Sequence, residues 1–193
     1  MLSWLIRRLG GSDRPRIRGI PIELRNTRED IADADVIERL DEALALIAQY
    51  QPHRFWHLAR DIRGIRIERF PTRGAFLPAE DTVLTELTFL ARRDISAAPV
   101  ASSILHEGVH ARVHAFRTRV LGGRADEASM AREERLCRRA ELAFGRSLPH
   151  ELGAPVIERA LASLTLADAE VAPVIDWREA RARQDEVDQG RGG

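Results

Sequence analysis

The chain has 193 residues, of which 44% are hydrophobic, and its 30 basic residues balance its 30 acidic residues to a formal net charge of zero. This length favours one domain with its own core. The balanced charge argues against a general nucleic-acid-binding protein, which normally has a basic surplus. All basic residues are arginines, so no lysine can act as a nucleophile, and the single cysteine, Cys137, excludes an intrachain disulfide.

The N-terminal residues 1–9, MLSWLIRRL, are apolar with two arginines, but the run is too short for a secretory signal. They could lie weakly at a membrane surface, or they could pack on the domain. No apolar run reaches the length that crosses a bilayer, which favours a cytoplasmic protein. Residues 11–30 resemble an extended lead-in, so we expect an N-terminal extension over residues 1–30. A single domain over 31–170 and a C-terminal helix with a polar tail over 171–193 would follow.

The first half of the predicted domain changes from helical to strand periodicity. Apolar residues recur every three or four positions over 33–50, which predicts an amphipathic helix that ends before Pro52, and a second helix is expected over 53–62. Alternation around Ile65 and Ile67 predicts a strand. Further strands are expected over 74–78 and, most clearly, over 82–90. Together they predict a small antiparallel sheet, with Pro71 and Pro78 at an edge.

Helices are predicted for most of the second half. One should begin near Pro99 and run to about residue 120, where Gly122 and Gly123 would stop it. Others are expected over 126–145, 154–165 and 175–186, and the polar residues 185–193 should be disordered. Helices, a small sheet and then more helices indicate an α+β domain.

The most informative motif is HEGVH, with His106, Glu107 and His110 inside the helix predicted from Pro99. Residues four apart lie on one face of a helix, so both imidazoles can bind one ion. Zinc accepts imidazole nitrogen in a tetrahedral shell and makes a bound water more acidic, and the adjacent Glu107 can then take the proton of that water. The alternative is a pair of solvent-facing histidines.

The helix around HEGVH has a predicted core stripe, which comprises Leu105, Val109, Phe116 and Val120. The two histidines lie about 100° from that stripe. His114 continues the series, but about 12 Å along the helix axis separates it from His106, so we expect a supporting or surface role for it.

A third zinc ligand is expected from the next helix, where Glu133 and Glu134 compete. The apolar face of that helix is predicted to comprise Leu136, Cys137, Ala140, Ala143 and Phe144. Glu133 lies near the middle of this face, where a carboxylate is costly unless it is paired or bound to a metal. We therefore predict Glu133 as the ligand and keep Glu134 as the alternative; both could instead be solvated charges at a helix start.

Two other features are interpreted as structural. The segment that begins His150-Glu151 imitates the motif, but Ala154 stands where the second histidine would be, and we expect a loop or helix cap there. Cys137 could be a soft metal ligand, yet a lone buried cysteine on a helix is more often part of a core.

The HEGVH motif, followed by REERLCRRAELAF just over twenty residues later, resembles the gluzincin zinc metallopeptidases. The compact layout is most similar to their minimal members, the minigluzincins of the ImmA/IrrE type, over roughly residues 60–150. The resemblance implies a zincin-like core, zinc bound by His106, His110 and a downstream glutamate, and Glu107 as general base. It also implies that the strand at 82–90 or its neighbour borders the cleft, where a peptide or protein substrate would bind as an added strand.

A peptidase also needs a donor that stabilises the oxyanion of the tetrahedral intermediate. The sequence does not rank the candidates, which are Tyr50, His53, His57, Arg112 and His150. Three functions remain open at this point: a zinc-dependent peptidase, a zinc-stabilised binding or regulatory protein without turnover, and an interaction module in which HEGVH is accidental.

Overall fold

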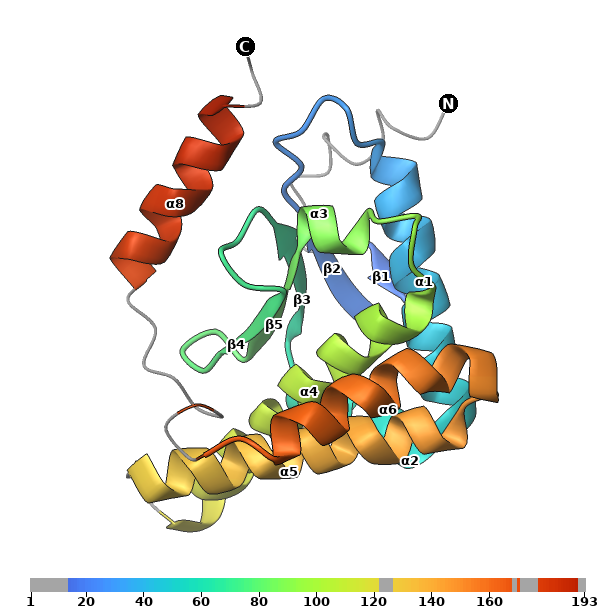
Figure 1. The fold of residues 1–193 in the computed structure, drawn as a ribbon, viewed down its shortest axis with the longest axis vertical. Helices are drawn as coiled ribbons and strands as arrows, with labels where there is room; N and C mark the ends of the chain where they lie inside the picture. The colour runs from blue at the N-terminus through green and yellow to red at the C-terminus, as the bar shows by residue number, and fades with distance from the viewer. Residues whose placement is uncertain (1–13, 122–126, 168–169, 171–176, 191–193) are drawn as a thin grey trace.

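The fold is taken from a computed structural model that describes residues 14–121, 127–167, 170 and 177–190 (Figure 1). The expected membrane contact of residues 1–9 and the helix stop at Gly122-Gly123 therefore lie outside the described residues. In the described part of the chain, no helix is long and apolar enough to cross a membrane.

The sheet has five strands in the order β1-β2-β3-β5-β4. The strands are β1 (Arg16–Ile17), β2 (Ile20–Leu24), β3 (Gly64–Glu68), β4 (Gly74–Leu77) and β5 (Thr82–Glu86). β4 lies at one edge and pairs antiparallel with β5, in the register Ala75 to Leu84. β3 pairs in parallel with both of its neighbours, β2 and β5.

The prediction of an antiparallel sheet is therefore wrong, because the sheet is mixed. The error has two sources. β3 and β5, both expected from the sequence, pair in parallel, and residues 20–24, which were expected in an extended lead-in, form β2 inside the sheet. Ile20 and Ile22 are each 1% exposed, so this strand belongs to the core, and the sheet begins before the predicted boundary at residue 30. Parallel strands need a long crossover, and the two helices between β2 and β3 provide it.

The strand expected over 82–90 is also shorter than predicted. It ends at Glu86, and Leu87–Leu90 form one helical turn, α3. The cause is local: the Glu86 carboxylate accepts a hydrogen bond of 2.6 Å from the backbone N–H of Phe89 and so caps the turn. Apolar alternation continues past residue 86, but the cap makes the chain leave the sheet there.

The longer helices match the predicted periodicity closely. They are α1 (Asp33–Tyr50), α2 (Pro52–Asp61), α4 (Ala97–Phe116), α5 (Glu127–Ser147), α6 (His150–Leu164) and α8 (Trp177–Gly190). A π-helical turn, η1 (Arg117–Leu121), extends α4. α6 begins at His150 with Pro149 as its N-cap, so the expected helix boundary is there, but residues 150–153 form the first helical turn and not a loop. α8 includes residues 185–190, which we expected to be disordered.

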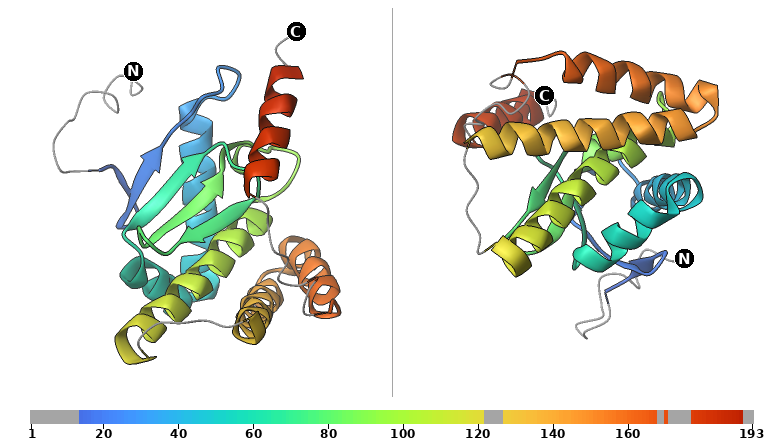
Figure 2. Two further views of the ribbon diagram at one scale, coloured as in Figure 1. Left: turned by 90° about the vertical axis from the view of Figure 1, so that its left-hand side faces the viewer. Right: turned by 90° about the horizontal axis from the view of Figure 1, so that it is seen from below.

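Helix α4 is the central element of the α+β fold. It packs against β4 and β5 and also against α1, α2, α5 and α6. Figure 2 shows α1 and α2 on one side of α4 and the antiparallel pair α5 and α6 on the other. Nearly every residue from Ala97 to Gly108 is buried, so the first three turns of α4 are core and its HEGVH segment faces α5.

Candidate metal centre

The HEGVH segment lies in the middle of α4, which begins at the N-cap Ser96. His106 is 6% exposed and His110 is partly buried, so the alternative of two solvent-facing histidines is excluded. The predicted core stripe holds only in part. Leu105 is buried, whereas Phe116 is 54% exposed, because α4 passes the end of its packing partners before it finishes.

The imidazoles of His106 and His110 and the carboxylate of Glu134 converge on one point. The two Nε2 atoms lie 3.2 Å apart. Glu134 places Oε1 3.1 Å from His110 Nε2 and Oε2 3.3 Å from His106 Nε2. A tetrahedral zinc site with ligands at 2.0–2.1 Å has edges of about 3.3 to 3.4 Å. The two Nε2 atoms therefore have nearly the spacing of two corners of such a tetrahedron, and each lies at a similar distance from one of the two oxygens of Glu134.

The other nitrogen of each imidazole is held by a second carboxylate. His106 Nδ1 lies 2.5 Å from Glu141 Oε1, and His110 Nδ1 lies 2.7 Å from Glu133 Oε1. An Nδ1–H that donates to a carboxylate fixes the ring and leaves the Nε2 lone pair for a metal. Both histidines are thus oriented as metal ligands are.

The structure assigns different positions to the two competing glutamates. Glu134, the alternative in the sequence analysis, faces both Nε2 atoms, whereas Glu133 meets His110 from the Nδ1 side and forms an ion pair with Arg117. The apolar face of α5 is rotated from the one predicted, since Leu136 is 49% exposed. The buried face instead runs from Ala131 through Cys137 to Glu141, and Glu134 lies on it.

The histidines and glutamates of the candidate centre shift one another's pKa values toward the charged forms. Burial alone would lower the pKa of His106, but hydrogen bonds with Glu134 and Glu141 outweigh burial and raise it. Burial would likewise raise the pKa of Glu134, but the two histidines lower it. The carboxylate of Glu134 is therefore ionised, as a metal ligand must be.

Cys137 adds a buried sulfur to this group. The ligand atoms of His106, His110 and Cys137 lie within 4.8 Å of one another, so this buried His-His-Cys group could hold a metal ion. Cys137 is 0% exposed, and burial raises the pKa of its thiol to about 11. Cys137 is in the core, as expected, but it also adjoins the metal centre.

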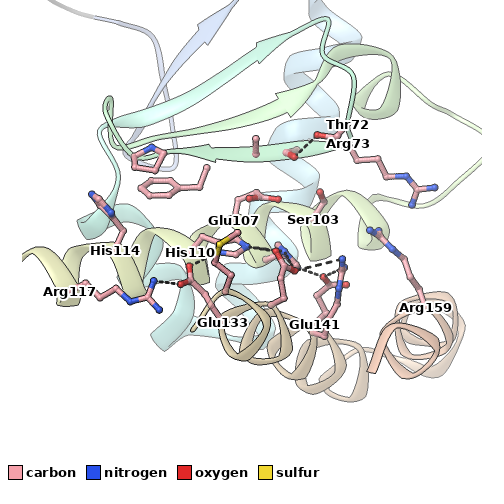
Figure 3. A pocket seen from close by; sticks show the side chains of 18 of the residues that line it. Thr72, Arg73, Ser103, Glu107, His110, His114, Arg117, Glu133, Glu141 and Arg159 are labelled. Atoms are coloured by element: carbon pink, nitrogen blue, oxygen red, sulfur yellow. Dashed lines mark hydrogen bonds and ion pairs between the residues drawn. The ribbon is translucent and has the colours of Figure 1, made fainter. Parts of the chain in front are cut away.

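Glu107 lies beside the two histidines, between α4 and the sheet (Figure 3). It is 9% exposed, and burial raises the pKa of its carboxyl group. Among the described residues, no hydrogen bond or ion pair engages its carboxylate. A buried, uncommitted carboxylate next to a metal centre has the properties of a general base.

A cleft of about 590 Å³ opens over these residues. One wall is edge strand β4, which approaches α4 closely: a methyl group on Gly74 would lie 3.2 Å from Ser103 Oγ and 3.4 Å from Glu107 Cγ. His106, Glu107, His110 and Glu134 all line this cleft. The donor atoms thus line a cleft beside β4, the edge strand of the sheet that the described residues form.

His114 lines the cleft beyond the metal centre, and its ring centroid lies 5.5 Å from that of Phe76 on β4. None of the five proposed oxyanion donors lines the cleft. His57 and Arg112 line a separate cavity of about 80 Å³, His53 and His150 are exposed, and Tyr50 packs against the core.

Sequence reasoning missed Glu141 as the partner of His106, and it missed three cleft arginines, Arg73, Arg138 and Arg159. Glu141 could have been found from its spacing, because it stands seven residues after Glu134 and so lies on the same helix face. The arginines carried no comparable signal, since they come from three different elements.

Comparison of the chain with protein-family models, with curated proteins and with solved structures finds no match. The function must therefore be inferred from the geometry of the site.

Proposed function

We propose that this protein is a zinc-dependent metallopeptidase of the minimal gluzincin kind, with zinc held by His106, His110 and Glu134. The observation that carries the proposal is the convergence of two imidazole Nε2 atoms, 3.2 Å apart, with the carboxylate of Glu134, whose two oxygens lie 3.1 and 3.3 Å from them; a second carboxylate orients each imidazole. Two imidazoles and one carboxylate, with a fourth position open to a cleft, are a donor set typical of catalytic zinc.

A zinc ion at this point would supply Lewis acidity to a water molecule and to a peptide carbonyl. The residues of the chain supply the other functions. Glu107 accepts a proton from water in the cleft and can return it to the leaving amine, for which its raised pKa is favourable. β4 offers backbone groups to an extended peptide, and Arg138 and His114, which line the cleft, are candidates to stabilise an oxyanion.

The test combines metal content with turnover. Elemental mass spectrometry of the purified protein should find about one zinc per chain, and His110→Ala should lose it. Glu107→Gln should keep the zinc and lose cleavage of a peptide library by at least about 100-fold, the contribution of a general base. No zinc in the wild-type protein after zinc is supplied and excess removed would overturn the proposal.

A second candidate function is favoured by Cys137. If its sulfur were a ligand beside the two histidines, the shell would close and the metal would stabilise a non-catalytic binding or regulatory protein. Cobalt substitution distinguishes the two, because a thiolate ligand adds an intense charge-transfer band in the near ultraviolet. We expect no such band, and Cys137→Ala should keep one zinc per chain; a band that this variant abolishes would favour the closed site.

A further inference from the structure

Some of the described charged side chains along the cleft form ion pairs with one another, and others do not. Four glutamates and four arginines line it: Glu107, Glu133, Glu134, Glu141, Arg73, Arg117, Arg138 and Arg159. Arg117 forms an ion pair with Glu133, and Arg138 donates to Glu141 at 2.8 Å. Arg73 and Arg159 differ, because no carboxylate of the described residues lies within ion-pair distance of either guanidinium group.

These two arginines come from opposite walls of the cleft. Arg73 immediately precedes β4, and its guanidinium carbon lies 5.1 Å from the ring centroid of Phe89. Arg159 projects from α6 and is partly buried. Figure 3 shows the two guanidinium groups pointing toward each other, at the end of the cleft opposite His114 and Arg117.

This arrangement is unfavourable for the empty protein. Burial, together with the positive charges of Arg73 and Arg138, lowers the pKa of Arg159, and Glu141 and Glu107 offset only part of this. A metal dication bound by His106, His110 and Glu134 would add further positive charge to the cleft. An anion between the two guanidinium groups would relieve the repulsion, and a carboxylate suits them because guanidinium groups bind carboxylates with two parallel hydrogen bonds.

Antiparallel pairing is slightly more stable per residue than parallel pairing, and for an antiparallel peptide the direction of β4 fixes which end lies there. A peptide that adds to the free edge of β4 in antiparallel orientation runs from Leu77 toward Gly74, so its carboxyl-terminal side reaches Arg73. On that path it passes Glu107 and the metal centre, since Gly74 adjoins Glu107. The arginine pair therefore lies where the carboxyl-terminal residues of the peptide would be.

We propose that Arg73 and Arg159 form a subsite that binds a carboxylate of the substrate, on the carboxyl-terminal side of the cleaved bond. The proposal rests on the proposed function for the identity of the ligand as a peptide. Two sources have this chemistry: the α-carboxylate of a peptide end, which would make the enzyme act near C-termini, and the side chain of Asp or Glu, which would give an acidic sequence preference.

The test reads the two arginines directly. Full-length Glu107→Gln protein, with zinc and again with chelator, is titrated while the arginine Nε–Hε resonances are followed by NMR; the lysine variants of Arg73 and Arg159 assign these resonances. Three probes are compared: N-acetyl-Ala-Ala with a free carboxylate, the same dipeptide as its amide, and N-acetyl-Glu amide, whose only carboxylate is in the side chain.

Both arginine resonances should shift with at least one carboxylate probe and stay in place with the dipeptide amide. The probe that acts at lower concentration identifies the source of the carboxylate. Equal shifts with the amide, a response confined to one arginine, or no shift at the solubility limit would overturn the proposal. Failure of the proposed function would instead appear as absent zinc or absent turnover, which this measurement does not require.

Substitution provides an independent check. Arg159→Gln and Arg73→Gln should each weaken binding of the active probe about tenfold, the effect of losing one charged hydrogen-bonding partner. Arg139→Gln is the matched control, because Arg139 is exposed on α5 and does not line the cleft. Unchanged affinity in both cleft variants, with native circular dichroism, would contradict the subsite.

Discussion

At the scale of single residues, the proposed metal centre depends on two kinds of carboxylate that the sequence presents side by side. Glu134 meets the Nε2 atoms, whereas Glu133 and Glu141 hold the Nδ1 atoms. A ligand and an orienting partner contribute differently to affinity, because only the ligand donates electrons to the metal. The neighbouring glutamates can therefore be told apart by measurement.

We expect Glu134→Ala to abolish stoichiometric zinc binding, whereas Glu133→Gln and Glu141→Gln should weaken it by about 10- to 100-fold. Zinc competition with a chromogenic chelator measures each dissociation constant. Glu151→Gln is a suitable control, since Glu151 is exposed at the start of α6. If Glu133→Ala lost zinc and Glu134→Ala kept it, the ligand assignment would be reversed.

The motif His106-Glu107-x-x-His110 could be recognised from the sequence because i and i+4 on a helix fix relative direction regardless of tertiary contacts. The choice between Glu133 and Glu134 could not be made with the same security. It depends on which face of α5 packs against the rest of the fold. Leu136 was counted in the predicted buried face, but it is exposed. Such a rotation is set by the docking partner, which the sequence of one helix does not contain.

At the scale of elements, the end of β5 is set by one side chain. The Glu86 carboxylate caps α3 through Phe89 and forms an ion pair with Arg69, and Glu86 is only 6% exposed. Removing it takes the acceptor away from the Phe89 backbone N–H and removes the ion pair with the partly buried Arg69.

We therefore expect Glu86→Ala to lower the free energy of unfolding by about 2 kcal/mol, the upper part of the range for loss of a cap. Glu38→Ala, which removes an exposed surface pair with Arg93, should cost less than about 1 kcal/mol. Urea denaturation followed by circular dichroism compares the two. Equal effects would show that the cap is unimportant.

The contact between α5 and α6 depends on two facing glycines. A methyl group on Gly153 would lie 2.2 Å from the carbonyl oxygen of Gly145, a backbone atom that cannot move aside. A methyl group on Gly108 would instead lie 2.9 Å from Leu58 Cδ1, the end of a side chain that can shift.

Gly153→Ala should therefore destabilise the protein by about 1 to 3 kcal/mol, although alanine is the better helix former. Gly108→Ala should cost clearly less, and denaturation midpoints at unchanged slope provide the comparison. If Gly153→Ala left the free energy of unfolding unchanged, α6 would pack against α5 more loosely than described.

At the scale of the whole molecule, the helices and their order follow from apolar periodicity, and so does the α+β class. The mixed sheet did not follow from it. Pro21 and the charged residues around it hid the alternation of Ile20, Ile22 and Leu24, and the parallel pairing of β3 with β5 has no local signal. Pairing direction is a property of distant segments. The crossover through α1 and α2 makes β2 and β3 parallel, and no local pattern encodes it.

A metal held between α4 and α5 should stabilise the whole fold. At a free zinc concentration of 100 times the dissociation constant, the gain is about 2.7 kcal/mol, and the melting temperature should rise by roughly 5 to 10 °C. Differential scanning calorimetry with and without chelator measures this shift. Glu107→Gln should retain the shift in melting temperature, and His110→Ala should lose it. The same shift in both variants would show that zinc stabilises the protein from somewhere other than the proposed site.

Among the described residues, the three carboxylates that meet the two histidines all come from α5, so one helix holds them at fixed relative positions. In evolutionary terms, this divides the chain into parts that tolerate length changes and parts that do not. One residue inserted between Glu134 and Glu141 would turn the last carboxylate by 100° away from His106. In homologous sequences we therefore expect a fixed spacing between the glutamates at positions 133 and 141, and a variable number of residues between α4 and α5.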